Sequence, residues 1–329
     1  MNWEYQAPWW LPGGQAQTIH SALWARTHEL PHPEWSRQRW DTPDQDFIDV
    51  DWLETHATHE PASTQDKVLC VLFHGLEGSS RSHYARAWAD QARQWGWRLA
   101  VPHFRGCSGE TNRAPRAYHS GDYEEIGWIL QRMRSQHAGL LLAVGVSLGG
   151  NALMRWAQEA GEAASQTVDA VASVGSPLDL TASGHAIGRG FNRLVYTPMF
   201  LRTMKPRALA KLAQFPGLFD REALLKARDL YEFDNLFTAP LHGFADVDDY
   251  WRRASAAPHF HRVRVPALVI NALNDPFVPA ASLPGLQEVS GCVTLWRPAQ
   301  GGHVGFAEGG FPGDVRGLPR AIGHWFQAL

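Results

Sequence analysis

Six short apolar runs recur along the chain, and longer amphipathic segments separate them. The runs cover residues 68–74, 98–104, 140–146, 170–175, 267–272 and 293–297. They are apolar almost throughout rather than alternating, as strands are when both faces of a sheet are covered. This rhythm predicts an α/β fold with a mostly parallel central sheet flanked by helices.

The segments expected to be helical fall between and after these runs, at residues 82–95, 121–137, 148–160, 280–289 and 315–328. A further run, residues 47–53, precedes them and mixes apolar residues with Asp49 and Asp51. Such a mixture is typical of a strand with one face toward solvent. We therefore expect a half-exposed edge strand that begins the sheet.

The segment from about residue 178 to 260 breaks this rhythm with short helical pieces, scattered glycines and prolines, and many aromatic residues. Most loops in compact domains span only a few residues, so an excursion of this length indicates a functional element. We expect one α/β domain over residues 1–329, into which residues 178–260 insert a helical cap or lid.

The charge of the chain excludes one large class of partners. The formal net charge is −3 and the pI is about 6.6, so no positive field attracts phosphates and nucleic acid is not an expected partner. The first twenty residues lack a signal sequence, and no apolar run reaches the ~18 residues that span a bilayer. We expect a cytoplasmic protein without a transmembrane segment.

The cysteines and histidines do not show the spacings that are typical of metal sites. Cys70, Cys107 and Cys292 are too widely spaced for a disulfide framework or a zinc site, and each is expected to be a small core residue. His259 and His261 are close enough in sequence to share a metal, but no carboxylate is near them, and ordinary loop residues are the alternative. No metal and no cofactor is predicted.

The sharpest local pattern is Gly145-Val146-Ser147-Leu148-Gly149, which stands between the apolar run 140–146 and a helical segment. A serine at a strand-to-helix turn is held in a strained backbone conformation that projects its hydroxyl above the sheet. Side chains at positions 145 and 149 would crowd the turn, which explains both glycines. The pattern predicts that Ser147 is a nucleophile.

A nucleophilic serine needs a histidine base, and that histidine needs a carboxylate to orient it. Where a serine stands at such a turn, the acid and the histidine follow it in that order, on loops after later strands. His303 comes after the last apolar run and is the predicted base. Asp275 follows the run 267–272 and is the predicted acid, with Asp179, after the run 170–175, as the alternative.

The other candidate histidines fit this order less well. His83 and His103 precede the serine, and His324 falls inside the terminal helical segment. His74 also precedes the serine, and its two interpretations are a structural hydrogen bonder that shapes its loop and a catalytic group.

Acyl transfer passes through a tetrahedral oxyanion that needs hydrogen-bond donors. In the arrangement expected here, these are the backbone N–H after the nucleophile and one from the loop after an earlier strand. The predicted donors are Leu148 and Leu76. Gly75 lets the backbone turn so that the Leu76 amide points into the site.

Together these motifs resemble the YheT-like subfamily of α/β-hydrolases, relatives of the eukaryotic abhydrolases that include lipid esterases and phospholipases. The resemblance spans nearly the whole chain and rests on residues 8–14 (PWWLPGG) with Gln17-Thr18, 74–79 (HGLEGS), 104–109 (FRGCSG), 145–151 (GVSLGGN), 274–277 (NDPF) and 302–303 (GH). It implies the α/β-hydrolase fold, a triad at Ser147, Asp275 and His303, and an esterase-type activity.

We predict a serine hydrolase that cleaves carboxylic esters through an acyl-enzyme, with short- to medium-chain or lipid-like acyl esters as small-molecule substrates. The alternatives are an acyltransferase or thioesterase with the same triad, and a binding module without catalysis. Apolar residues of the cap are expected to enclose the acyl chain, namely Phe191, Tyr196, Met199, Phe200, Phe215, Phe219 and Phe244.

Trp9-Trp10, in a chain with 15 tryptophans, has two interpretations. Indole rings favour the membrane interface, so the pair indicates a peripheral membrane contact, or it packs on the core as tryptophan commonly does. The sequence predicts no oligomeric state.

Overall fold

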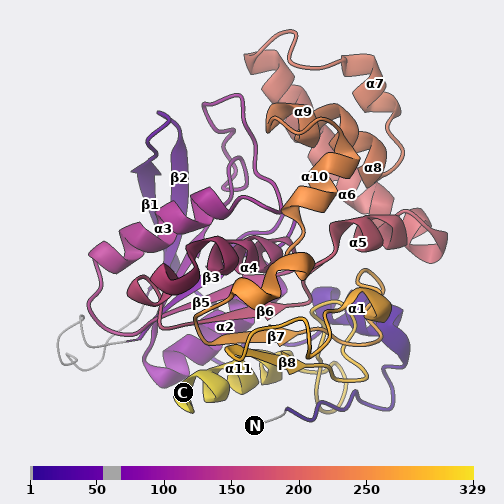
Figure 1. Cartoon of the computed structure of the whole chain (residues 1–329). Coiled ribbons are helices and arrows are strands. Elements are labelled where there is room, and N and C mark those ends of the chain that lie inside the picture. Colours follow the sequence, from indigo (N-terminus) through magenta and orange to yellow (C-terminus); the bar gives the residue numbers. More distant parts are fainter. Residues whose placement is uncertain (1–2, 55–67) are drawn as a thin grey trace.

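The computed structural model describes residues 3–54 and 68–329, and its centre is an eight-stranded sheet in the order β1-β2-β4-β3-β5-β6-β7-β8 (Figure 1). The pairs β1–β2 and β2–β4 are antiparallel, and all the other pairs are parallel. The predicted mostly parallel sheet is therefore confirmed. The strands are β1 Trp35–Asp41, β2 Phe47–Leu53, β3 Leu69–Phe73, β4 Arg98–Pro102, β5 Leu141–Val146, β6 Ala170–Val174, β7 Ala267–Ile270 and β8 Val293–Trp296.

The prediction that residues 47–53 form a half-exposed edge strand is wrong. β2 lies inside the sheet between β1 and β4, and all its residues except Trp52 are buried. Its carboxylates are buried because arginines of β1 pair with them, Arg37 with Asp51 at 2.7 Å and Arg39 with Asp49 at 2.8 Å. The true edge, β1, is mostly polar and exposed, so it lacks the apolar pattern that predicts a strand.

Helices cover both faces of the sheet, with α3 and α4 on one face and α2 and α11 on the other (Figure 1). The predicted helices at 82–95, 121–137, 148–160 and 315–328 are present, but the one at 280–289 is wrong. Only the 3-10 turn Ala280–Ser282 forms there, because Pro284 disfavours helical backbone at the residue before it. The bounds are α1 Gly13–Leu23, α2 His83–Trp95, α3 Tyr123–Ser135, α4 Leu148–Ala160, η1 Gly161–Gln166 and α11 Gly317–Gln327.

A helical insertion, residues 178–260, separates β6 from β7 and lies above one end of the sheet (Figure 1). Its two ends are joined by a hydrogen bond from the Ala257 N–H to the Leu178 carbonyl, at 2.9 Å. Asn151 of α4 donates to the Ala254 carbonyl at 2.8 Å and so ties the returning end to the core. The insertion contains α5 Leu180–Ile187, α6 Gly190–Gln214, α7 Arg221–Lys226, α8 Leu230–Phe233, the π-helix η2 Asp234–Thr238, α9 Ala239–Leu241 and α10 Val247–Ala254, and η3 Ala257–Arg262 leads back to the sheet.

The three cysteines and the two N-terminal tryptophans differ in how far they are buried. Cys70 and Cys107 are buried and Cys292 is half-buried, and all three thiols are free. Trp10 packs beside Leu11 and donates its indole N–H to the Gly309 carbonyl at 3.1 Å, whereas Trp9 is 92% exposed. Within residues 3–54 and 68–329, no helix is both long and apolar enough to cross a bilayer.

Candidate active site

Ser147 occupies the turn between β5 and α4, at the carboxyl edge of the sheet. Its backbone has φ 53° and ψ −120°, in the region that favours glycine. The backbone can adopt this strained conformation because Gly145 and Gly149 leave room for close contacts between the strand, the turn and the helix. A Cβ at position 145 would lie 2.4 Å from the Gly150 Cα, and one at position 149 would lie 2.5 Å from the His74 carbonyl oxygen. The predicted reason for both glycines is confirmed.

His303 reaches Ser147 from the loop after β8. Its Nε2 lies 3.0 Å from the Ser147 Oγ, and its Nδ1 lies 2.9 Å from the Asp275 Oδ2. The His303 side chain is 12% exposed and that of Asp275 is fully buried. The structure thus brings together the three side chains that the sequence singled out, in one hydrogen-bonded chain.

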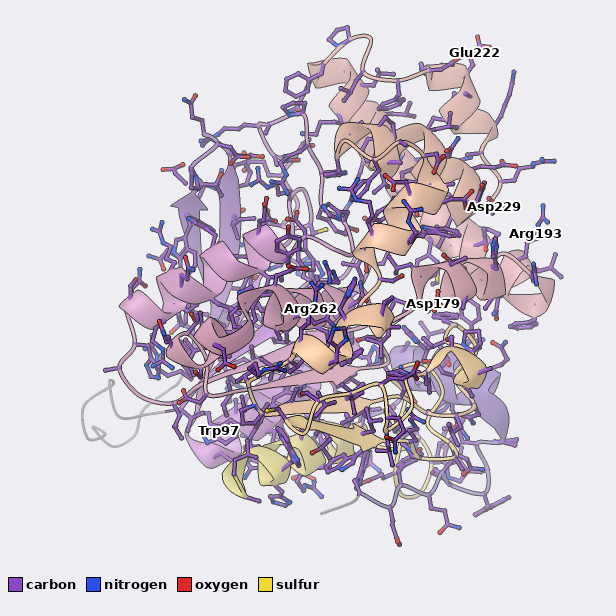
Figure 2. All side chains as sticks on the ribbon, viewed as in Figure 1. Trp97, Asp179, Arg193, Glu222, Asp229 and Arg262 are labelled. Carbon is purple, nitrogen blue, oxygen red and sulfur yellow. The ribbon has the colours of Figure 1, made fainter. Side chains whose placement is uncertain are left out.

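Asp275 is held by its own loop. Its Oδ1 accepts hydrogen bonds from the backbone N–H groups of Phe277, at 2.7 Å, and Val278, at 3.2 Å, which leaves Oδ2 for the histidine. The alternative acid, Asp179, instead caps α5 by accepting from the Ala182 N–H at 2.9 Å, and Figure 2 labels it where the chain leaves the core. Asp275 therefore meets His303 and Asp179 does not.

The backbone amides predicted as oxyanion donors flank the serine. Leu148 is the first residue of α4, where helical N–H groups have no partner in the preceding turn. Leu76 lies in the turn after β3, between Gly75, whose N–H donates to the Tyr84 hydroxyl at 2.9 Å, and Glu77. Within the described residues, neither leucine amide donates to another protein group. Both leucines line the same pocket as Ser147.

Two side chains of α1 hold the His303 loop in place, and the sequence did not predict this role. The Thr18 hydroxyl accepts from the His303 N–H at 2.8 Å and donates to the Gly14 carbonyl at 2.7 Å. The Gln17 amide oxygen accepts from the Gly301 N–H at 2.8 Å and from the Asn274 side chain at 2.9 Å. The Gln17-Thr18 motif was the available signal, but its partners are more than 250 residues away in sequence.

A family model described as the alpha/beta hydrolase fold matches residues 69–310, well over half of the chain. The chain belongs to the α/β-hydrolase family. The predicted YheT-like resemblance is confirmed as well, because the "Putative esterase YheT" of Escherichia coli (strain K12) is 41% identical over 297 residues, which are 89% of this chain and 84% of that protein.

More distant relatives extend the comparison. The "Phospholipase ABHD3" of Mus musculus is 29% identical and the match covers 88% of this chain and 70% of that protein. Among solved structures, the Pyrococcus furiosus esterase Pf2001 matches with a TM-score of 0.54 at 15% identity, over 90% of this chain and 93% of that one. The mouse alpha/beta hydrolase domain-containing protein 10 matches with a TM-score of 0.53 at 13% identity, over 89% and 99% of the two chains. At such identities these structures show the shared fold alone.

Three histidines that precede the serine in this α/β-hydrolase, His74, His83 and His103, make structural contacts. His74 accepts the Phe104 N–H at its Nε2, 3.1 Å away, and its Nδ1 lies 2.8 Å from the Gly75 carbonyl. Burial lowers the pKa of His74 to about 3, so it stays neutral and braces the loop that carries Leu76. His103 lies 2.8 Å from Asp51, and His83 contacts the Val304 carbonyl at 3.1 Å. The structural interpretation of His74 fits these contacts.

One pocket joins Ser147 and His303 to the inner side of the helical insertion. It holds about 1200 Å³ of empty space, counted with its opening to solvent. Its walls are largely apolar and include Leu180, Ile187, Phe200, Met204, Ala208, Leu230, Phe233, Phe237 and Phe277.

The prediction of which insertion residues enclose the pocket is mostly wrong. Of the seven named, only Phe200 lines it. Phe191 and Met199 face outward, 49% and 52% exposed, and Tyr196 packs edge-on against Phe277 with ring centroids 4.5 Å apart. Phe219 and Phe244 pack against other residues of the insertion, because aromatic residues there also hold the helices to one another. The Phe215 ring lies 5.6 Å from the Lys211 ammonium.

Two cationic side chains of α6 that line the pocket contact loops of the core. Arg207 of α6 pairs with Glu77, beside Leu76, at 3.1 Å. The Lys211 ammonium donates to the carbonyls of Asn112 and Ala114 at 2.7 and 2.8 Å, and burial lowers its pKa to about 8. α6 is therefore fastened to the core loops that surround the site.

Asp234 is the one pocket carboxyl on the π-helix. It accepts hydrogen bonds from the Thr238 hydroxyl at 2.6 Å and from the Trp251 indole N–H at 2.9 Å. Burial raises its pKa to about 6, with these two donors acting in the opposite direction. Its charge is thus sensitive to pH in the range where ester hydrolysis is commonly measured.

The two histidines that could share a metal lie outside the pocket lining. His259 and His261 lie on the short 3-10 helix Ala257–Arg262, away from the pocket-lining residues. Among the described residues, no three side chains of His, Cys, Asp or Glu converge in a way that would hold an ion.

Proposed function

We propose that this α/β-hydrolase is a serine hydrolase that cleaves carboxylic esters. The observation that carries the proposal is the continuous chain from the Ser147 Oγ to His303, at 3.0 Å, and from His303 to the buried Asp275, at 2.9 Å. Such a chain raises the nucleophilicity of a hydroxyl that is otherwise unreactive at neutral pH. The names of the bacterial and mouse relatives, an esterase and a phospholipase, support the same class of substrate.

In the proposed mechanism, His303 Nε2 takes the proton of Ser147 as the Oγ attacks the ester carbonyl. The alcohol leaves with that proton, and an acyl-enzyme remains on the serine. Water then attacks the acyl group, giving a proton to His303, and the acid is released as the serine regains it. Asp275 stays ionised and keeps the His303 Nδ1–H pointed toward itself throughout.

Charge that develops on the carbonyl oxygen has two donors in this proposal, the N–H groups of Leu148 and Leu76. The Leu148 amide also lies at the positive end of α4, which favours negative charge. Because Arg207 pairs with Glu77, the helical insertion and the Leu76 turn are mechanically joined. The position of one donor thus depends on how α6 is seated.

We further infer that the helical insertion acts as a cap over the acyl group. Phe200, Met204 and Ala208 of α6 face the pocket that holds Ser147, and Phe233 and Phe237 complete the apolar wall. Apolar surface of this kind gains free energy by taking an alkyl chain out of water. Short- to medium-chain or lipid-like acyl esters fit such walls better than peptides do.

Hydrolysis of p-nitrophenyl esters from acetate to palmitate tests the proposal. The wild type is expected to hydrolyse members of the series, and Ser147→Ala to lose at least about 10⁴-fold in kcat. Ser183→Ala is the matched control, because this buried serine also lines the pocket but makes no contact with His303. A fluorophosphonate should add its mass to the wild type and to Ser183→Ala but not to Ser147→Ala.

Two results would contradict the proposal. One is a wild type that hydrolyses none of the esters and takes up no fluorophosphonate. The other is Ser147→Ala with unchanged activity. If acyl groups instead pass to an added alcohol in preference to water, the same triad serves a transferase.

A further inference from the structure

The solvent face of α6 is apolar where it should be polar. Phe191, Leu194, Val195 and Met199 recur at positions i, i+3, i+4 and i+8, and they are 49%, 77%, 39% and 52% exposed. The opposite side of the helix is buried against the rest of the molecule. We call these four exposed residues the α6 stripe. A surface helix normally turns its apolar residues toward the core, but no other element of the described residues covers this second stripe.

The charge around the α6 stripe is one-sided. Residues 180–219 contain no Asp or Glu and six Lys or Arg, of which Arg207 pairs with Glu77 and Lys211 is buried, in a chain whose formal net charge is −3. Arg189, Arg193 and Arg202 are exposed and form no salt bridge with any described residue. Figure 2 shows Arg193 at the outer margin of the insertion.

Carboxylates of α8 lie on the side of Arg193. Hydrogen bonds from the Arg228 N–H, at 2.7 Å, and from its guanidinium, at 3.1 Å, lower the pKa of Glu232, and Arg193 adds to this effect. Asp229 caps the same helix. The charge of Arg193 is therefore partly balanced, and the positive excess beside the α6 stripe comes from Arg189 and Arg202.

We propose that the α6 stripe, with Arg202 on the same face of the helix and Arg189 just before its first residue, binds the surface of an anionic phospholipid bilayer. An exposed apolar stripe bordered by cations is the arrangement by which a helix lies in the membrane interface. Each arginine near an anionic surface adds attraction, and the apolar side chains add burial in the headgroup region. The stripe is much shorter than a membrane span, so the protein rests on the bilayer.

A second copy of the chain fits this surface less well. In a two-fold symmetric dimer the same patch faces itself, so Arg189 and Arg202 of one copy would be brought close to those of the other. Like charges in a buried interface oppose association, whereas anionic headgroups neutralise them.

The placement of α6 also connects the membrane to the pocket. Phe200 follows Met199 directly and, with Met204 and Ala208, lines the pocket that contains Ser147. One helix therefore presents its outer face to the bilayer and its inner face to the site. This consequence for substrate delivery rests on the proposed function, whereas membrane binding itself does not.

Flotation with vesicles tests binding without any reliance on catalysis. The Ser147→Ala protein is mixed with vesicles of phosphatidylcholine alone or of phosphatidylcholine with phosphatidylglycerol, and the bound fraction is measured at low and high salt. Binding is expected to the anionic vesicles and to weaken with salt. Leu194→Ser should lower the affinity by about tenfold. Arg202→Gln should lower it by about fivefold.

Matched controls are exposed residues outside α6. Leu286 is 75% exposed, close to the 77% of Leu194, so Leu286→Ser should leave binding unchanged. Arg320 is exposed on α11, on the far side of the sheet from the insertion (Figure 1), and Arg320→Gln should lower binding by less than Arg202→Gln. Melting temperatures should be unchanged in all four variants, because the replaced side chains are exposed.

The proposal is overturned if neither vesicle is bound, or if Leu286→Ser weakens binding as much as Leu194→Ser. It is also overturned if Trp9→Ser abolishes binding while Leu194→Ser does not, since the lipid-facing surface would then be the N-terminal segment. A wild type that dimerises, with Leu194→Ser monomeric and equally bound to vesicles, would assign the α6 stripe to self-association instead.

Discussion

The carboxyl edge of the sheet and the helical insertion contribute to the same pocket in different ways. At the sheet edge, Ser147, Asp275 and His303 each follow a parallel strand, and the strands themselves bring the three side chains together. In the insertion, the pocket residues come from α5, α6, α8, the π-helix and α10, so the pocket wall forms only where these separate helices pack together. Chemistry placed on strand ends can be predicted from sequence, whereas the shape of the substrate wall depends on how helices pack.

The largest test of this contrast concerns the acid. Asp275→Asn should keep the pocket intact but lower kcat by about 10⁴-fold, because an amide cannot hold His303 in the tautomer that accepts the serine proton. Asp179→Asn is the control and should leave kcat unchanged, since Asp179 only caps α5. Steady-state hydrolysis of one p-nitrophenyl ester measures both. An equal loss in the two variants would mean that the sheet edge does not localise the chemistry as proposed.

The next largest loss of activity is expected when the hydrogen bond from α1 to the His303 loop is removed. Thr18→Val removes the hydroxyl that accepts the His303 N–H, so the imidazole shifts and kcat should fall by about 10- to 100-fold with little change in KM. Thr18→Ser restores the hydroxyl and should recover most of the rate.

Thr18 thus acts by positioning His303 rather than by touching substrate. If Thr18→Val instead raises KM alone, or if Thr18→Ser fails to restore kcat, the residue serves only the stability of the fold. Melting temperatures of both variants separate that outcome from a loss of catalytic geometry.

The insertion side is tested through chain length. Ala208 is fully buried on the pocket side of α6, and Ala208→Leu should shorten the preferred acyl chain and slow palmitate hydrolysis relative to acetate by about tenfold. Ala210→Leu, at an exposed position of the same helix, should leave the chain-length profile unchanged. Unaltered palmitate hydrolysis in Ala208→Leu would show that the acyl chain lies elsewhere.

The smallest expected effect concerns stability and pH. The pKa of Asp234 is raised from 3.8 to about 6 by burial, so the folded state holds a proton that the unfolded state releases. The carboxyl therefore stabilises the fold most below pH 4, and this contribution is lost as pH rises through about 6.

Asp234→Asn should remove that pH dependence. Urea unfolding at pH 4 and pH 7 measures this. The free energy of unfolding of the variant, relative to that of the wild type, should be about 2 kcal/mol higher at pH 7 than at pH 4. A wild type whose stability rises over this range by more than the variant's would contradict a raised pKa for Asp234.

Much of the molecule follows from the chain by itself. The apolar runs predict the parallel strands, and the Gly-x-Ser-x-Gly turn predicts the strained Ser147, because both depend on residues within a few positions of one another. The order of serine, acid and histidine then follows from where the strands end. The same local patterns fail at β1, whose polar residues form a strand by pairing along their whole length with β2, where Asp49 and Asp51 bind two of its arginines.

Tertiary structure alone decided the rest. Gln17 and Thr18 reach the His303 loop across more than 280 residues, and such contacts leave no periodic trace in the sequence. It also decided that Phe191 and Met199 face outward while Phe200 and Met204 face inward. Both sides of α6 carry apolar residues, so the pattern of the helix cannot say which side meets the core until the helix is packed against it.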